Sequence, residues 1–362
     1  MNRLKVKLSG LHLENPVMPA AGPPIRNGEA ALAAAQGGAG AIVTKTISDK
    51  AAQVPKQCMA QIPGGFLNTE LWSELEPEHW LEHEYPKVKE TGLPIIVGLG
   101  YTQEQIEKLA KRVEPFADAL ELSTHYLGDD PSPVVDAIKA AKGAVDLPVY
   151  VKLSPQIDIK RFATAAQDAG ADGLVLINSL GPCLDIDIET GKPLMGSSTG
   201  YGWLSGNAIF PVALGAVYEA YKYVDIPILG VGGISSGQQA IKMIMAGAQA
   251  VQVCTAAILE GPGIYGRIAR QMEKYMEERG IYGLDEIRGL AHQHQREQDL
   301  DRWLPQVDAD KCTACGLCAQ SCVYSAIDIK DYAIIDEERC FGCGLCMTRC
   351  KFGAITPKYA DV

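Results

Sequence analysis

The C-terminal part of the chain contains the same cysteine pattern twice. The first run comprises Cys312, Cys315, Cys318 and Cys322, and the second comprises Cys340, Cys343, Cys346 and Cys350. Both runs read C-x2-C-x2-C-x3-C, the spacing of bacterial modules that hold two [4Fe-4S] clusters. Three closely spaced thiolates bind three irons of one cluster, and the fourth thiolate comes from the other run. The pattern therefore predicts that this chain carries single electrons.

The crossed arrangement predicts two ligand sets. One set is Cys312, Cys315, Cys318 and Cys350, and the other is Cys340, Cys343, Cys346 and Cys322. Structural zinc and disulfides are the alternatives. Zinc usually takes two C-x2-C pairs, and disulfides need an oxidising compartment, which nothing in the sequence suggests. Val323 and Lys351 replace the proline that usually follows the fourth cysteine. Proline is not a ligand, so iron–sulfur clusters remain the prediction.

Charge and hydropathy exclude several classes of partner. The net charge of -11 argues against nucleic acid, because a phosphate backbone requires clustered Lys and Arg. The N-terminus lacks the long apolar segment of a signal peptide, and no apolar run is long enough for a transmembrane helix. The other cysteines, Cys58, Cys183 and Cys254, are expected to be reduced thiols. We expect a cytoplasmic protein with no membrane partner.

Short apolar runs alternate with Ala-rich helical stretches over the first 284 residues, which is the pattern of repeated βα units. The predicted strands are Pro16–Ala21, Gly40–Lys45, Pro94–Gly98, Ala117–Leu122, Pro148–Leu153, Gly173–Asn178, Pro227–Val231 and Ala250–Cys254. Eight such units and about 250 residues are typical of an α/β TIM barrel. We therefore predict a (β/α)8 barrel over residues 1–284, a linker over 285–304 and a ferredoxin-like domain with two [4Fe-4S] clusters over 305–362.

Two features place a site at the carboxyl ends of the strands. The connections after the second and sixth strands, Thr46–Leu93 and Ser179–Ile226, are unusually long, and long loops at this end of a barrel are often functional. Gly232 and Gly233 follow the seventh strand, and Thr255 follows the eighth. Loops at these positions commonly bind phosphate. FMN fits this pattern better than a dinucleotide does, and it links one-electron to two-electron chemistry.

Several motifs resemble the dihydroorotate dehydrogenase superfamily, and most of all the FMN and iron–sulfur half of dihydropyrimidine dehydrogenase. They include Thr44-Lys45-Thr46, Phe66-Leu67-Asn68-Thr69-Glu70, Val151-Lys152-Leu153 and Gly202-Trp203-Leu204-Ser205-Gly206. The resemblance implies an FMN barrel with two [4Fe-4S] clusters. It places the FMN contacts at Ala21, Gly22, Lys45, Lys152, Gly232, Gly233 and Thr255. The alternative for the two lysines is a solvated position at a strand end.

The resemblance also implies a set of substrate contacts. They fall on Asn68, Glu70, Asn178 and Ser179, while Ser123 stands where the family has a substrate-binding asparagine. Amide and carboxylate groups match the donors and acceptors of a lactam or imide. The alternative for both asparagines is that they cap turns of their own loops.

The loop after the fourth strand departs from the family. The family pattern E-L-N-x-S-C-P has a cysteine that exchanges a proton with substrate, and this chain reads Glu121-Leu122-Ser123-Thr124-His125-Tyr126-Leu127. Tyr126 occupies the cysteine position, and its phenol is protonated at neutral pH. We predict Tyr126 as the catalytic acid and His125 as the second candidate. Tyr201 is a third, and Tyr126 packing against the pocket wall is the alternative.

The predicted function is that of an FMN-dependent oxidoreductase that reduces or forms an activated C=C bond of a small cyclic or unsaturated carbonyl compound. Because the chain has no room for an FAD- and NAD(P)H-binding half, a partner subunit or a ferredoxin is expected to exchange electrons with it. A homodimer or hetero-oligomer is expected from the resemblance. One alternative is a non-catalytic electron-transfer subunit. Another is a tRNA dihydrouridine synthase, against which the acidic charge argues.

Overall fold

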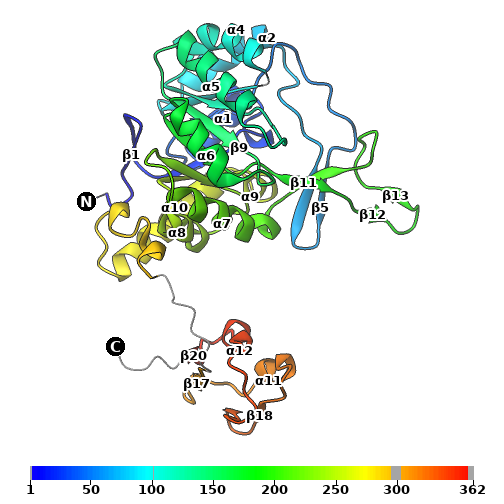
Figure 1. Ribbon diagram of the computed structural model, residues 1–362, viewed down its shortest axis with the longest axis vertical. Helices are drawn as coiled ribbons and strands as arrows, with labels where there is room; N and C mark the ends of the chain where they lie inside the picture. The colour runs from blue at the N-terminus through cyan, green and yellow to red at the C-terminus, as the bar shows by residue number, and fades with distance from the viewer. Residues whose placement is uncertain (1, 101, 295–302, 358–362) are drawn as a thin grey trace. The chain divides into compact units, whose positions relative to one another are not determined.

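The computed structural model describes residues 2–100, 102–294 and 303–357. The chain divides into two compact units, with the division after His294. Each unit is described by itself below, and Figure 1 shows the elements of both. Within the described ranges, no helix is long and apolar enough to cross a membrane.

The first unit is a (β/α)8 barrel, as predicted. Its eight strands are β3 (Val17–Pro19), β4 (Ile42–Val43), β7 (Ile95–Leu99), β8 (Ala119–Leu122), β9 (Val149–Leu153), β10 (Gly173–Leu176), β15 (Ile228–Val231) and β16 (Ala250–Val253). They are parallel and lie in the hydrogen-bonded order β4-β7-β8-β9-β10-β15-β16-β3. Gly40 N, just before β4, donates to Val17 O of β3 at 2.8 Å. This hydrogen bond links the first and last strands of the order and so closes the barrel. Each strand lies within a predicted range or differs from it by one residue.

Helices follow the strands and cover the outside of the barrel (Figure 1). They are α1 (Gly28–Gln36), α2 (Pro77–His79) continued by the π-helix η2 (Trp80–Glu84) and α3 (Tyr85–Lys89), α4 (Gln103–Val113), α5 (Ser132–Ala144), α6 (Ile159–Asp168), α7 (Phe210–Tyr221), α8 (Gly237–Ala246), α9 (Thr255–Glu260) and α10 (Ile264–Glu278). Helix α4 shows why they form. Thr102 and Gln105 make a capping box at its start, and Ile106, Leu109 and Val113 bury one face.

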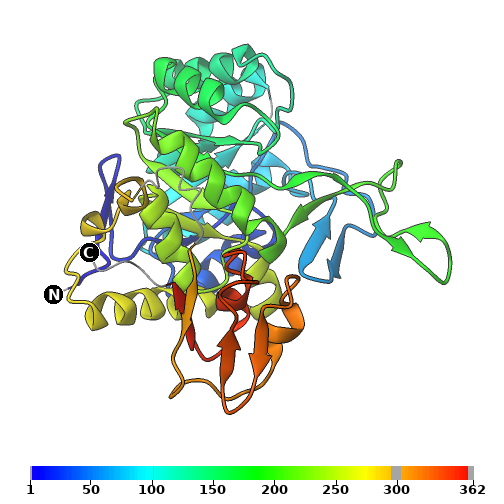
Figure 2. The same ribbon diagram turned by 60° about the horizontal axis from the view of Figure 1, so that its bottom comes forward.

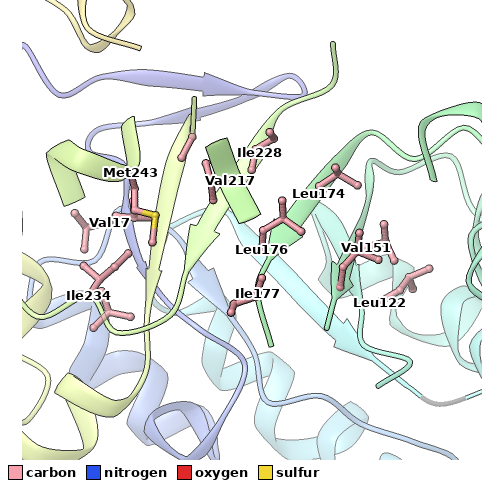
Figure 3. Close-up of a cluster of buried hydrophobic side chains, with 14 of the residues drawn as sticks. Val17, Leu122, Val151, Leu174, Leu176, Ile177, Val217, Ile228, Ile234 and Met243 are labelled. Carbon is pink, nitrogen blue, oxygen red and sulfur yellow. The ribbon is translucent and has the colours of Figure 1, made fainter. Parts of the chain in front are cut away.

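The strands are buried on both faces. Val151, Leu174 and Leu176 belong to the core between sheet and helices, together with Val217 of α7 (Figure 3). Tyr150 belongs to a second cluster of barrel residues, which also contains Leu8 and Leu13 of the hairpin β1 (Val6–Leu8) and β2 (Leu11–Leu13). Tyr150 OH donates to Leu8 O at 3.3 Å. Burial on both sides explains the near-continuous apolar strands of the sequence.

The two long connections fold together into an antiparallel sheet. Its strands are β5 (Met59–Ile62), β6 (Gly65–Asn68), β11 (Leu180–Cys183) and β14 (Gly202–Ser205), in the order β11-β14-β6-β5. Figure 2 shows the blue strands of the first connection beside the green strands of the second. A small hairpin, β12 (Ile186–Asp187) and β13 (Lys192–Pro193), extends from the green part. Segments more than 100 residues apart are thereby joined beside one end of the barrel.

The predicted linker 285–304 begins with residues that pack on the barrel. The described part of this unit also contains short 3-10 helices. They are η1 (Pro23–Ile25), η3 (Glu114–Phe116), η4 (Asn207–Ile209), η5 (Leu284–Glu286) and η6 (Leu290–His292), and the last two lie at this end of the unit. Leu284 and Ile287 are buried, and Gly289 N donates to Ile244 O at 3.1 Å. Residues 295–302 of the predicted linker lie outside the described residues.

The second unit has an internal two-fold pattern. Strands β17 (Pro305–Val307) and β20 (Ile355–Pro357) pair antiparallel, as do β18 (Ile327–Ile329) and β19 (Ala333–Ile335). Each cysteine run continues into one short helix, α11 (Leu317–Ser321) or α12 (Leu345–Arg349). A small core contains Ile327, Ala333 and Ile355 together with Cys318 and Cys346. The cysteines therefore take part in the packing of this unit.

Candidate functional site

A cavity of about 400 Å³ lies at the carboxyl ends of the barrel strands. The segments that follow β3, β4, β8, β10, β15 and β16 line it, together with the antiparallel sheet. It brings together the residues predicted for FMN, which are Ala21, Gly22, Lys45, Lys152, Gly232, Gly233 and Thr255. It also contains those predicted for substrate, which are Asn68, Glu70, Ser123, Asn178 and Ser179. His125 lines the cavity, and Tyr126 does not.

Lys45 is a buried cation with two carboxylate neighbours. Its Nζ lies 2.7 Å from Glu70 Oε2 and 3.7 Å from Glu74 Oε2. Lys45 is 3% exposed and Glu70 is 11% exposed, whereas Glu74 is 45% exposed. A buried charge is costly unless it is paired. These contacts show how the ammonium group is accommodated at the cavity wall, and they do not support a solvated strand-end lysine.

Lys152 lies in a second charged group inside the barrel. Its Nζ is 3.4 Å from Oε1 of Glu121, and both side chains are buried. The second carboxylate oxygen, Oε2 of Glu121, accepts from Gln252 Nε2 at 2.5 Å. Gln252 Oε1 is buried and has no hydrogen-bond partner in the part of the chain that the structure describes. An unpaired buried acceptor at a cavity wall points to a hydrogen-bond donor on a bound group.

The loops after β15 and β16 bring the three residues predicted to hold phosphate, Gly232, Gly233 and Thr255, to the cavity. Gly232 and Gly233 have φ values of 126° and 72°, a backbone region that favours glycine. A Cβ at position 233 would lie 2.7 Å from Gly206 O and 2.8 Å from Phe210 N. Thr255 Oγ1 donates to Ser205 Oγ at 2.9 Å and links this end of the cavity to the antiparallel sheet. Glycine at both positions keeps this part of the cavity lining free of side chains, which suits the predicted binding of the FMN phosphate.

His125 lies among aromatic side chains at the cavity. Its ring meets Trp203 edge-on at 4.4 Å between centroids, and the ring of Trp72 is 6.1 Å away. His125 adopts a left-handed φ of 49°. Burial lowers the pKa of His125 below its ordinary value, so the imidazole is neutral at pH 7. A neutral imidazole can accept a proton.

Tyr126 occupies a different environment from the one predicted for a catalytic acid. Its ring lies 6.2 Å from the ring of Phe162 and packs against the hydrophobic core. It is not among the residues that line the cavity. Tyr201, the third candidate, is also not among them. The arrangement matches the alternative of a packing role for Tyr126, and proton transfer by Tyr126 stays an untested prediction.

The two predicted asparagines use their side-chain oxygens locally. Asn68 Oδ1 accepts from Glu70 N at 3.3 Å, and Asn68 Nδ2 donates to Trp203 O at 3.1 Å. Asn178 Oδ1 accepts from Ser179 N at 2.8 Å. The turn-capping contacts are therefore present, while both residues also line the cavity.

Sequence reasoning missed four residues as parts of this site: Glu121, Gln252, Trp72 and Trp203. Glu121 and Gln252 each stand at a polar position inside an otherwise apolar strand. A polar residue in a strand that is buried on both faces signals a partner inside the barrel. Trp72 and Trp203 carried no such signal, because only the pairing of β6 with β14 brings their connections together.

The second unit contains two small cavities lined by cysteines. Cys312, Cys315, Cys318 and Cys350 line one, and Cys340, Cys343, Cys346 and Cys322 line the other. Backbone N–H groups donate to three of the sulfurs, from Ala333 to Cys312, Ala326 to Cys322 and Ala354 to Cys350, at 3.3 to 3.4 Å. Four cysteine sulfurs around each cavity, with N–H···S bonds from the backbone, suit a [4Fe-4S] cluster. The cysteines of each group are those of one crossed set that the spacing predicts, and their role as cluster ligands stays a prediction.

A (β/α)8 barrel with this mouth and a dicluster module define the class of the protein, a flavin- and iron–sulfur-containing oxidoreductase. Residues 3–276 match the family model for dihydroorotate dehydrogenase, and residues 311–354 match the model for a 4Fe-4S dicluster domain. The chain therefore belongs to the dihydroorotate dehydrogenase family.

Curated relatives are similar over most of the chain. The catalytic subunit of dihydroorotate dehydrogenase B (NAD(+)) from Methanothermobacter thermautotrophicus is 37% identical over 302 residues, which cover 80% of this chain and 98% of that protein. The subunits of the same name from Methanocaldococcus jannaschii and Methanosarcina mazei are 35% and 37% identical, again over 80% of this chain and over 98% and 96% of those proteins. These names do not single out the dihydropyrimidine dehydrogenase branch.

Proposed function

We propose that this protein reduces or forms an activated C=C bond in a small cyclic or unsaturated carbonyl compound. One observation carries this proposal: a single cavity contains both predicted flavin lysines and the predicted substrate side chains. Its membership of the dihydroorotate dehydrogenase family supports chemistry on CH–CH bonds. The motif around Asn68 and Glu70 resembles dihydropyrimidine dehydrogenase, so dihydropyrimidines belong among the compounds to be tested.

The residues of the barrel mouth fit FMN. Gly232, Gly233 and Thr255 would hold its phosphate, while Lys45 and Lys152 would face the electron-rich ring. When bound, FMN supplies hydride transfer and links one-electron to two-electron chemistry. The barrel mouth would orient the substrate, hold the lysine charges in place and restrict access of water.

We assign proton exchange to His125 in preference to Tyr126. His125 lines the cavity, and Tyr126 packs beside Phe162 outside it. The lowered pKa of His125 keeps its imidazole neutral. A neutral imidazole can accept the proton of the carbon next to the carbonyl when the substrate is oxidised. The protonated ring would return that proton when the substrate is reduced.

The dicluster unit would pass electrons between the flavin and a protein partner. We propose two [4Fe-4S] clusters, held by the two cysteine sets. The relatives are named as catalytic subunits of NAD(+)-dependent enzymes. A subunit that binds FAD and NAD(P)H, or a ferredoxin, is therefore the proposed partner, in a homodimer or hetero-oligomer.

Anaerobic stopped-flow measurements test this proposal. The protein is loaded with FMN and clusters, reduced, and mixed with enones and pyrimidines. Reoxidation of the flavin by at least one unsaturated carbonyl compound, with formation of the saturated product, is expected. If no compound reoxidises the flavin but an external electron-transfer protein does, the chain acts as a non-catalytic relay and the proposal fails. Besides the residues predicted for flavin, the cavity is lined by the residues predicted for substrate. Their presence favours the catalytic outcome.

A further inference from the structure

The cavity has no uncompensated cation among its described lining residues. Lys45 and Lys152 are the cationic residues of that lining. Lys45 is paired with Glu70 and Glu74, and Lys152 is paired with Glu121. Two ammonium groups therefore stand against three carboxylates. A substrate anion beside Lys45 would meet two carboxylates against one ammonium group, and beside Lys152 it would find no net positive charge. Neither lysine would therefore offer it a free cationic partner.

The aromatic residues of the cavity add no positive charge. Trp72, His125 and Trp203 form what we call the aromatic wall. Burial lowers the pKa of His125, so its ring is neutral at pH 7. Burial likewise raises the pKa of the Cys254 thiol, against the opposing effect of Lys152 and Lys45, so that it stays protonated. The wall offers ring faces and edges, which suit a planar ligand.

Two glycines leave the space that the tryptophans of the aromatic wall occupy. A Cβ at Gly100 would lie 1.8 Å from Trp72 Nε1, and a Cβ at Gly181 would lie 2.5 Å from Trp203 Cε3. Each tryptophan is therefore packed against backbone that has no side chain. Two such close approaches restrict the tryptophan rings, which favours a rigid binding surface.

From this arrangement we infer that the substrate bound in this cavity beside the flavin is an uncharged, planar, conjugated carbonyl compound and not a carboxylate such as dihydroorotate or orotate. The inference rests on the proposed function, because it names the substrate class of the same site. The relatives are named as dihydroorotate dehydrogenases, so the inference gives this chain a substrate class different from the one in their names. A pocket selects against a wrong ligand by leaving a charge without a partner, as it would for a substrate carboxylate here.

Matched pairs of probes test the inference by binding alone. Uracil and orotate share one ring and differ by a carboxylate, and benzylideneacetone and cinnamate share a conjugated phenyl ring. Each is titrated into the full-length, FMN-loaded oxidised protein, and the change in flavin absorbance is followed. In each pair that binds, the neutral probe should bind at least about tenfold more tightly. Equal or tighter binding of orotate or cinnamate would overturn the inference, and so would a lack of binding by both neutral probes.

Charge variants test the cause of the preference. Glu70→Gln removes the nearest partner of Lys45, so the affinity for orotate or cinnamate should rise about tenfold while the neutral probes change less. Glu74→Gln should do the same to a smaller extent, because Glu74 lies farther from Lys45 and is more exposed; it serves if Glu70→Gln does not fold. Glu82→Gln, at an exposed position of the π-helix, makes the same change in net charge and should have no effect.

An unchanged preference in both cavity variants would overturn the electrostatic explanation. Reoxidation of flavin is measured separately, by reducing the same protein preparations anaerobically and then mixing them with each probe. If neutral probes bind but none reoxidises the flavin, the ligand preference stands and the proposed function fails. If orotate both binds and reoxidises the flavin, the function stands and the inference fails.

Discussion

Lys152 and Glu121 lie on neighbouring parallel strands, and their Nζ and Oε1 atoms are 3.4 Å apart inside the barrel. Glu121 is fully buried, and Lys152 is nearly so. The carboxylate also accepts from Gln252. The contact with Glu121 holds the ammonium group of Lys152 where the resemblance places the flavin ring. A change in this ion pair should therefore affect both the stability of the barrel and the binding of FMN.

The first prediction concerns this pair. Glu121→Gln leaves a buried ammonium group without its partner, so the flavin-free protein should lose about 3 kcal/mol of stability. FMN should restore part of the loss, because its electron-rich ring offers Lys152 a new partner. Thermal unfolding with and without FMN measures both effects. Glu219→Gln, which breaks a surface pair with Lys222, should cost much less. Equal losses in the two variants would contradict the prediction.

The second prediction concerns the phosphate loop. Gly233→Ala forces a Cβ against Gly206 O and Phe210 N at a residue with left-handed φ. It should cost about 1–3 kcal/mol and greatly weaken FMN binding. Gly215→Ala is the matched control, because a Cβ there meets nothing within 4 Å on helix α7. It should stabilise the protein by up to about 1 kcal/mol. Flavin fluorescence titration and thermal melts distinguish the two variants.

The third prediction concerns acid stability. Burial lowers the pKa of His125, so the unfolded chain takes up a proton near pH 6.5 that folded His125 takes up only at lower pH. The stabilising contribution is complete above about pH 6.5 and is lost as pH falls toward the folded pKa. His125→Asn, which tolerates the left-handed backbone, should therefore show a smaller fall in melting temperature between pH 7.5 and 5.5. His83→Asn, at an exposed position, should keep the wild-type fall.

The fourth prediction tests the crossed cluster ligands by iron content. The double variant Cys312→Ser, Cys350→Ser removes two ligands from one set and should retain about four of eight irons per chain. The double variant Cys312→Ser, Cys322→Ser removes one ligand from each set and should disturb both clusters. If each run bound its own cluster, the results of the two variants would be exchanged. Cys183→Ser, in the barrel unit, should retain all the iron.

The fifth prediction separates the two candidate proton carriers. His125→Gln should lower the rate of substrate oxidation or reduction by about 100-fold or more, because it removes a proton-exchanging group from the cavity wall. Tyr126→Phe should change the rate by less than about threefold, since its ring packs beside Phe162. Rapid-reaction rates of flavin reduction and reoxidation measure both. The reverse ranking would restore Tyr126 as the acid.

Local patterns in the sequence were sufficient to predict the barrel strands and to predict which cysteines lie together. The run Pro148–Leu153 predicts β9 because a strand buried on both faces must be almost entirely apolar. Spacing alone predicts which cysteines gather around each cavity, because three thiolates within seven residues can reach one cluster and the fourth cannot. Backbone periodicity and short ligand spacing do not depend on distant parts of the chain.

Only the tertiary structure decided what surrounds the predicted residues. Lys45 and Lys152 were foreseen at the mouth, but their pairing with Glu70 and Glu121 depends on which strands and loops meet. His125 and Tyr126 are adjacent in sequence, and the left-handed turn at His125 sends one to the cavity and the other to the core. Charge compensation and side-chain direction depend on contacts between distant segments, so residue types alone could not reveal them.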